Sequence, residues 1–282
     1  MTPRLTDRPA LLRARARAAR GAPALFLHAE AATEIKERLA EVNRTFTRPA
    51  VVTGWPAAWA GVLPGARIVP DDPALALEAG AHDLIVHAMA LHWADDPVGQ
   101  LVQCRRALVP DGLLLGVLFG GRTLAELRAV LAEAEAAVTG GLSPRVLPMA
   151  EIRDLGGLLQ RAGLALPVAD SVALTASYAD AFALMRDLRA MGEANALHAR
   201  LRRPTRRAVL AEAARAYASA FPAEGGRVRA SFELIFLTGW APDASQPQPL
   251  RPGSASARLA DALGSTEQPL PDSVPRPGGG KS

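Results

Sequence analysis

Few residues of the chain combine a chemically useful type with a useful position. Five of them stand at or just after the ends of predicted strands: Gly54, Asp71, Asp72, His92 and Trp93. Asp71 and Asp72 precede Pro73, where an aspartate also serves as a helix N-cap or a turn residue. These five are the candidates for binding or chemistry, and the alternative for the two aspartates stays open at this level.

A metal centre is not expected. His82, His87 and His92 are spaced by five residues, and along one strand that spacing places neighbouring members on opposite faces. His87, between apolar neighbours, is expected to be a core histidine. The one cysteine, Cys104, excludes both an internal disulfide and a Cys-rich zinc site.

The elements that must position the candidates follow from the apolar pattern. Near-continuous apolar runs predict buried strands at 83–89 and 113–119, and residues 95–108 between them have helical periodicity. A turn is expected at 110–112, and Thr123 is expected to cap the next helix. Further expected elements are helices at 29–46, 151–163, 178–197 and 205–221 and strands at 49–53, 172–176 and 230–240. Strand alternating with helix is the order of an α/β layer fold.

Composition limits the class of protein. The chain has 282 residues, 49% hydrophobic and 21% charged, as in globular proteins. Its longest apolar stretches fall far short of the ~20 residues of a membrane span, and no secretory signal is evident, so a cytoplasmic location is expected. A net charge of only +4, without aromatic residues among the arginines, argues against a nucleic-acid partner.

The same pattern predicts three regions. Residues 1–28 form a basic N-terminal arm, expected to hold a solvated or frayed helix. The alternative is a helical arm that docks on something acidic. Residues 29–242 form the main domain, with a helical insertion at about 178–221. Residues 243–282 form a Pro/Gly-rich tail that is expected to be largely disordered.

Residues 82–97 (HDLIVHAMALHWADDP) and 105–128 (RRALVPDGLLLGVLFGGRTLAELR) resemble the latter half of class I S-adenosylmethionine-dependent methyltransferases. Segments 140–149, 178–195 and 230–242 resemble the subgroup that contains respiratory complex I assembly factor 5 and its alphaproteobacterial relatives. The resemblance implies an α/β fold: a Rossmann-like methyltransferase three-layer sandwich whose mostly parallel sheet has a reduced early half and an α-helical insertion.

The resemblance also implies a site. S-adenosylmethionine would lie over the carboxyl ends of the early strands, and the matching cofactor-binding positions are Gly54, Asp71, Asp72, His92 and Trp93. The catalytic residues stay unknown at this level. The partner implied is a respiratory-complex subunit or another protein.

The early half departs from the family pattern. In the segment 51–65 (VVTGWPAAWAGVLPG), Gly54 is the only glycine in the expected place, and Trp55 and Pro56 fill the turn. Since a glycine-rich loop lets the backbone approach the cofactor, weak or absent cofactor binding is expected.

The interval between Gly54 and Asp83 is short. By the resemblance, residues 66–86 align with the third strand, so the second strand and its ribose-binding carboxylate are expected to be lost. We therefore expect fewer than seven strands.

Two functions remain open at this level. One is a methyltransferase-superfamily enzyme acting on a protein or a small acceptor. The other is a non-catalytic assembly factor or binding module that uses the same fold.

Overall fold

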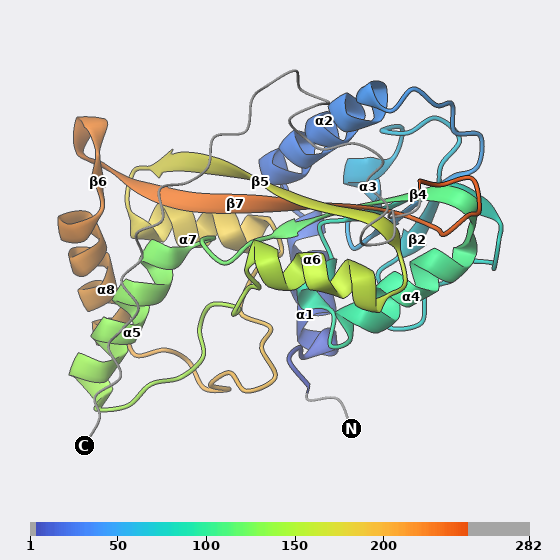
Figure 1. Cartoon of the computed structure of the whole chain (residues 1–282). Helices are drawn as coiled ribbons and strands as arrows, with labels where there is room; N and C mark the ends of the chain where they lie inside the picture. Colours follow the sequence, from blue (N-terminus) through green and yellow to red (C-terminus); the bar gives the residue numbers. More distant parts are fainter. Residues whose placement is uncertain (1–3, 248–282) are drawn as a thin grey trace, which may run out of the picture. The chain divides into compact units, whose positions relative to one another are not determined.

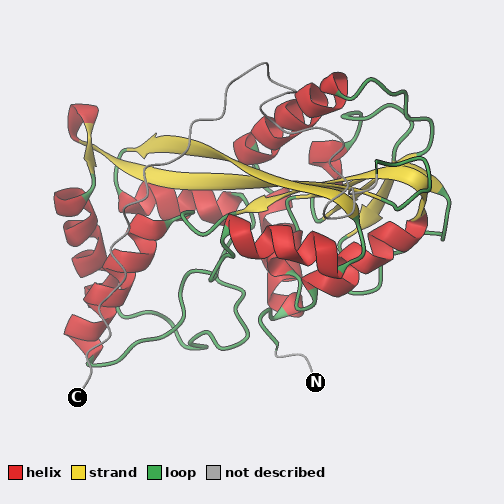
Figure 2. Ribbon diagram, viewed as in Figure 1, coloured by secondary structure: helices red, strands yellow, loops and turns green. Residues whose placement is uncertain are grey.

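A computed structural model describes residues 4–247 of the chain. Its centre is a seven-stranded sheet in the order β2-β1-β3-β4-β7-β5, with β6 paired to β7 (Figures 1 and 2). β2, β1, β3 and β4 are parallel, and β7 runs antiparallel between β4 and β5. The strands are β1 (Pro49–Thr53), β2 (Arg67–Pro70), β3 (His82–Ala88), β4 (Leu108–Phe119), β5 (Ala165–Tyr178), β6 (Pro222–Ala223) and β7 (Arg227–Trp240).

Helices cover both faces of this sheet. Figure 1 shows α2 on one side and α4 with α6 on the other, which makes the three layers. The helices are α1 (Arg8–Ala19), α2 (Phe26–Glu41), α3 (Pro56–Trp59), α4 (Pro97–Ala107), α5 (Ala125–Thr139), α6 (Ile152–Arg161), α7 (Ala181–Ala190) and α8 (Arg207–Ala220), with a short 3₁₀ helix η1 (Leu91–Trp93). The α/β sandwich with its helical insertion is confirmed.

The core explains the apolar runs. All seven residues of β3 are buried, because β1 and β4 flank it and helices cover both faces. Leu84 and Val86 join one apolar cluster with α2, whereas Ile85 joins a second cluster with α4 and α6. Successive side chains of β3 therefore point into two different apolar clusters, as expected for a strand with helices on both faces.

The early half of the sheet is reduced, but not as the sequence suggested. β2 pairs directly with β1, Ala50 opposite Arg67 and Thr53 opposite Pro70. In a doubly wound sheet the neighbour of the first strand on this side is the second strand. The prediction that the second strand is lost was therefore wrong: within residues 4–247 it is the strand beyond β2, at the edge, that has no counterpart.

The expected count of fewer than seven strands was also wrong, since two-residue β6 completes seven. Between β1 and β2 the structure has the short helix α3 and turns, as the prolines and glycines of 56–65 favour.

Two local predictions need correction. Residues 110–112 do not reverse the chain: they form a bulge inside β4, where Leu108 opposes His82 but Leu113 opposes Leu84. Asp111 takes the left-handed conformation there (φ 57°), which aspartate tolerates better than most residues.

Thr123 does not cap α5, whose N-cap position is Leu124. Its Oγ1 donates to the carbonyl of Glu233 (3.1 Å) and accepts from the Glu233 N–H (3.0 Å), so it ties the β4–α5 loop to β7.

The N-terminal arm is ordered and packed rather than frayed. α1 begins at Arg8 with Asp7 as its N-cap, and Leu11, Ala14, Arg15 and Ala18 are buried. Upstream, Thr6 forms an antiparallel bridge with Leu197. A solvated helix was the wrong expectation, because the arginines alternate with small and apolar residues that pack inward.

Most of the tail predicted for 243–282 lies outside the described residues. The region boundaries at 28 and 242 stay predictions. Among residues 4–247, no helix has the length and apolarity that crossing a membrane requires.

Candidate functional site

The carboxyl ends of β1, β2 and β3 meet at one edge of the sheet, as parallel strands must. Gly54 follows β1, Asp71 follows β2, and η1 with His92 and Trp93 follows β3 by two residues. Helix α1 contributes Arg8 and Arg15 to the same edge. The structure therefore gathers the five candidates into one region, but it divides them into two groups.

The first group centres on Asp71, whose side chain is only 4% exposed. Arg8 Nη2 contacts its Oδ1 and Arg15 Nη1 contacts its Oδ2, each at 2.8 Å. Burial alone would raise the pKa of Asp71, but hydrogen bonds and charge from these two arginines lower it to about 2. Asp72 lies beside it and pairs with Arg8 at 3.1 Å. The acid is thus ionised, with each of its oxygens paired to a cation.

Gly54 lies against the same arginine. A Cβ built on Gly54 would collide with Nη1, Cζ and Nη2 of Arg15. The space that a glycine leaves at the end of β1 is therefore filled by the Arg15 guanidinium. Trp55 beside it is 5% exposed, and its Nε1 has no hydrogen-bond partner among the described residues.

The second group lies around Glu193, after α7. Trp93 Nε1 donates to Glu193 Oε2 at 2.7 Å, and His92 Nε2 lies 3.7 Å from the same oxygen. Burial alone would raise the pKa of Glu193, but His92, Arg15 and Trp93 together hold it below its usual value. A largely buried carboxylate, whose side chain is 10% exposed, is thus held ionised next to His92 and Trp93 of η1.

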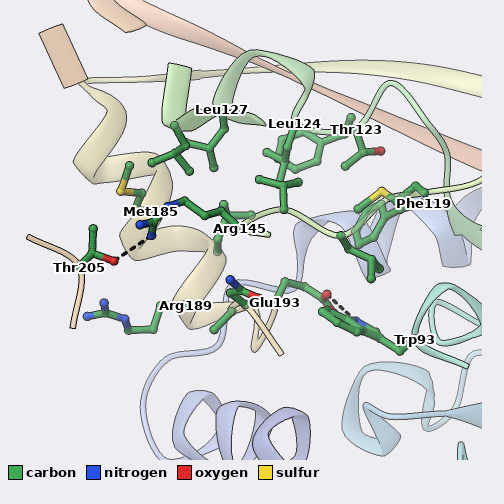
Figure 3. A pocket seen from close by; sticks show the side chains of 18 of the residues that line it. Trp93, Phe119, Thr123, Leu124, Leu127, Arg145, Met185, Arg189, Glu193 and Thr205 are labelled. Carbon is green, nitrogen blue, oxygen red and sulfur yellow. Dashed lines mark hydrogen bonds between the residues drawn. The ribbon is translucent and has the colours of Figure 1, made fainter. Parts of the chain in front are cut away.

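Glu193 and Trp93 form part of the wall of a cavity of about 280 Å³ (Figure 3). The wall is mostly apolar, with Phe119, Leu127 and Met185 among its residues. Figure 3 shows the Trp93–Glu193 hydrogen bond at one end of the cavity and Arg145 with Thr205 toward the other. An apolar cavity with few fixed polar groups is the usual form of a small-ligand site.

Arg145 is fixed in that wall. Its Nε and Nη2 contact the two carboxylate oxygens of Glu135 at 2.9 and 2.6 Å, and Nη1 donates to Thr205 at 2.8 Å. The positive charge of Arg145 is therefore neutralised within the protein. Arg189, also lining the cavity, is exposed and makes no ion pair within residues 4–247.

The histidines are not arranged for a metal. Within the described residues no group of three or more His, Cys, Asp or Glu side chains could hold an ion. His87 is fully buried in β3 and contacts Gln100 Oε1 at 2.7 Å, as a core histidine should.

Sequence reasoning missed three residues of this region: Arg15, Arg145 and Glu193. Arg15 was one of six similar arginines in the arm, and only its place between Leu11 and Ala18 on a packed helix face marks it out. Glu193 follows the last turn of α7, where nothing in its neighbours signals burial.

The chain is similar to curated proteins from two groups. Over 209 residues it is 35% identical to human "Arginine-hydroxylase NDUFAF5, mitochondrial", covering 74% of this chain and 60% of that protein. Over 184 residues it is 36% identical to "Malonyl-[acyl-carrier protein] O-methyltransferase" of Xylella fastidiosa, covering 65% of this chain and 60% of that protein.

The chain is a homologue of both groups. It spans about 60% of the length of these curated relatives. A putative methyltransferase structure from Bacillus halodurans matches with a TM-score of 0.46 and 15% identity, covering 73% of this chain and 97% of that one. No protein-family model matches the chain. The methyltransferase-like resemblance stated from the sequence is confirmed by the homologues.

Gly54, Asp71 and Arg15 lie together at the carboxyl ends of β1 and β2, a place called the cleft below. These residues can be tested against S-adenosylmethionine, the cofactor that the sequence resemblance implies. Close approach to Gly54 is blocked by Arg15, and both oxygens of Asp71 already bind arginines. With α1 in this position, the residues do not fit the cofactor.

Proposed function

We propose that this methyltransferase-like protein binds an arginine side chain of a partner protein in the cavity beside Trp93. The observation that carries the proposal is Glu193, an ionised carboxylate in the wall of a mostly apolar cavity. The name of the human homologue, an arginine hydroxylase, makes arginine the side chain to test first.

The cavity suits a guanidinium chemically. A cation in a partly desolvated cavity needs a negative partner and gains from aromatic faces. Glu193 supplies the charge, and Trp93 and Phe119 supply aromatic rings in the wall. Trp93 also fixes Glu193 through its 2.7 Å hydrogen bond, so less side-chain freedom is lost on binding.

The two arginines of the wall do not oppose this ligand equally. Arg145 is bound to both oxygens of Glu135, and so its charge is compensated. Arg189 is exposed, where water and salt screen its charge. The charge that a bound guanidinium would meet at the buried end is that of Glu193.

Isothermal titration with a short arginine peptide and its citrulline counterpart tests the proposal, because citrulline keeps the shape and loses the charge. We expect the arginine peptide to bind at least tenfold more tightly, and Glu193→Gln to abolish that preference. Glu212→Gln, on α8 and outside the cavity wall, is the matched control. Equal binding of both peptides, or unchanged preference in E193Q, would contradict the proposal.

Whether the protein catalyses a reaction is also a matter of proposal. The homology to O-methyltransferases favours an S-adenosylmethionine-dependent transferase, and the closed cleft favours the non-catalytic binding module. We infer the binding module, with a respiratory-complex subunit as the partner to test. A cytoplasmic location remains the expectation from the sequence.

A further inference from the structure

Helix α1 lies across the edge where the resemblance places a cofactor. It packs against α7, and its Arg15 points toward the ends of β1 and β2, where it contacts Asp71 and fills the space at Gly54. The Arg15 side chain is only 6% exposed, so this is an interior contact rather than a surface ion pair.

The chain before α1 is tied to two segments, the one that follows α7 and the 3₁₀ helix η1. On one side, the Asp7 N–H donates to Ala196 O at 2.7 Å, and Arg200 contacts Asp7 at 2.8 Å. On the other side, Thr6 Oγ1 donates to Trp93 O at 2.8 Å. These bonds fix the position of the first residues of α1.

Arg15 also provides a hydrogen-bond partner for the buried carboxylate of Asp71, as the ribose of a bound nucleoside would. A buried carboxylate at the end of the second strand must be paired, and in dinucleotide-binding sheets a ribose hydroxyl pairs with an acid at this place. Here Arg15 and Arg8 pair with Asp71 instead. Two other arginines of α1, Arg13 and Arg17, are exposed and make no such contact within the described residues.

We propose that Arg15 is a built-in replacement for the nucleoside cofactor, so that docking of α1 and binding of S-adenosylmethionine are mutually exclusive. The guanidinium neutralises Asp71 and occupies the approach to Gly54. The fold is thereby complete without the cofactor, and the cofactor gains access only where α1 leaves.

The guanidinium is anchored through one of its three nitrogens. Nη1 contacts Asp71, whereas Nε and Nη2 have no hydrogen-bond partner among the described residues. Unpaired buried N–H groups cost free energy, which offsets part of the gain from the ion pair. Removing Arg15 should therefore open the cleft without unfolding the sheet, whose core lies elsewhere.

The test measures binding of S-adenosylhomocysteine and S-adenosylmethionine by isothermal titration to wild type, Arg15→Ala, Arg15→Gln and the control Arg13→Ala. We expect both Arg15 variants to bind at least tenfold more tightly than wild type, and R13A to bind as wild type does. Equal affinity in folded wild-type and Arg15 variants would overturn the proposal. Weaker binding in the variants would make Arg15 a cofactor ligand and overturn it as well.

Hydrogen exchange on wild-type protein decides the question if the variants do not fold. At millimolar S-adenosylhomocysteine, the amides of residues 8–19 should exchange faster than without ligand, and unchanged exchange would contradict the proposal. Slower exchange of 8–19 in the presence of ligand would show that α1 closes over the cofactor, and the proposal would fail.

Discussion

The guanidinium of Arg15 lies against the backbone of Gly54, in the space that a Cβ on Gly54 would occupy. Gly54, which matches a glycine of the family's loop, is therefore needed in this protein to leave room for the Arg15 side chain. Gly54 does not have a positive φ, so alanine is compatible with its backbone. Steric contact with Arg15 is what disfavours a larger residue.

Gly54→Ala should destabilise the protein, because the new Cβ displaces Arg15 from Asp71 and leaves a buried charge less well paired. We expect a loss of about 1–3 kcal/mol in wild type and less than about 0.5 kcal/mol in an Arg15→Ala background. Denaturant unfolding of the four proteins of this double-mutant cycle measures the coupling.

The matched control for that cycle is Gly157→Ala in α6, where an added Cβ meets nothing within 4 Å. It should be neutral or slightly stabilising, since alanine favours a helix. Strictly additive losses for the Gly54 and Arg15 substitutions would show that the two residues do not interact.

His28 should make stability depend on pH between about 6.5 and 4. Its Nδ1 accepts a hydrogen bond from Trp59 Nε1 at 3.0 Å, and burial lowers its pKa from 6.5 to about 4. As the pH falls through this range, His28 binds a proton in the unfolded chain but stays neutral in the folded protein. The free energy of unfolding is therefore highest above pH 6.5, and it falls by about 3 kcal/mol as the pH is lowered toward 4.

Unfolding free energies measured from pH 7 to pH 4 check this. His28→Gln should flatten the profile, and the slope that remains is expected from His87, whose pKa burial also lowers. His198→Gln, at an exposed position, is the control. An unchanged profile in H28Q would contradict the assignment.

Thr123→Val should destabilise the β4–α5 loop. Thr123 is 1% exposed, and its hydroxyl satisfies both the N–H and the carbonyl of Glu233. Valine keeps the shape and leaves the Glu233 N–H without this acceptor, at a cost of about 1–3 kcal/mol, whereas the Glu233 carbonyl still accepts from the Gly120 N–H at 2.8 Å. A thermal shift of several degrees below wild type is the expected result.

Thr33→Val provides the comparison, because Thr33 is exposed on α2 and bonds only the carbonyl of Ala29. It should cost a few tenths of a kcal/mol. Equal losses for the two variants would mean that the Thr123 hydroxyl contributes nothing specific.

The sequence alone determined the main layers of this protein. Residues 83–89 and 113–119 are apolar almost without interruption, as is typical of strands covered on both faces, and the structure buries both runs in β3 and β4. The order of strands and helices around them, and the motifs at 82–97 and 105–128, indicated the methyltransferase-like fold that the homologues confirm. Local pattern carries this information because burial on a strand or a helix face repeats with a fixed period.

The tertiary structure alone decided what lies next to what. The sequence could not show that β2 pairs with β1, because a strand of four residues does not specify which strand it pairs with. The prediction of which strand is missing was therefore wrong. Nor could it distinguish Arg15 from the other arginines of the arm or place Glu193 beside Trp93, 100 positions earlier in the chain. Contacts of that range depend on docking of whole elements, and α1 docks where the carboxyl ends of the strands leave Asp71 to be paired.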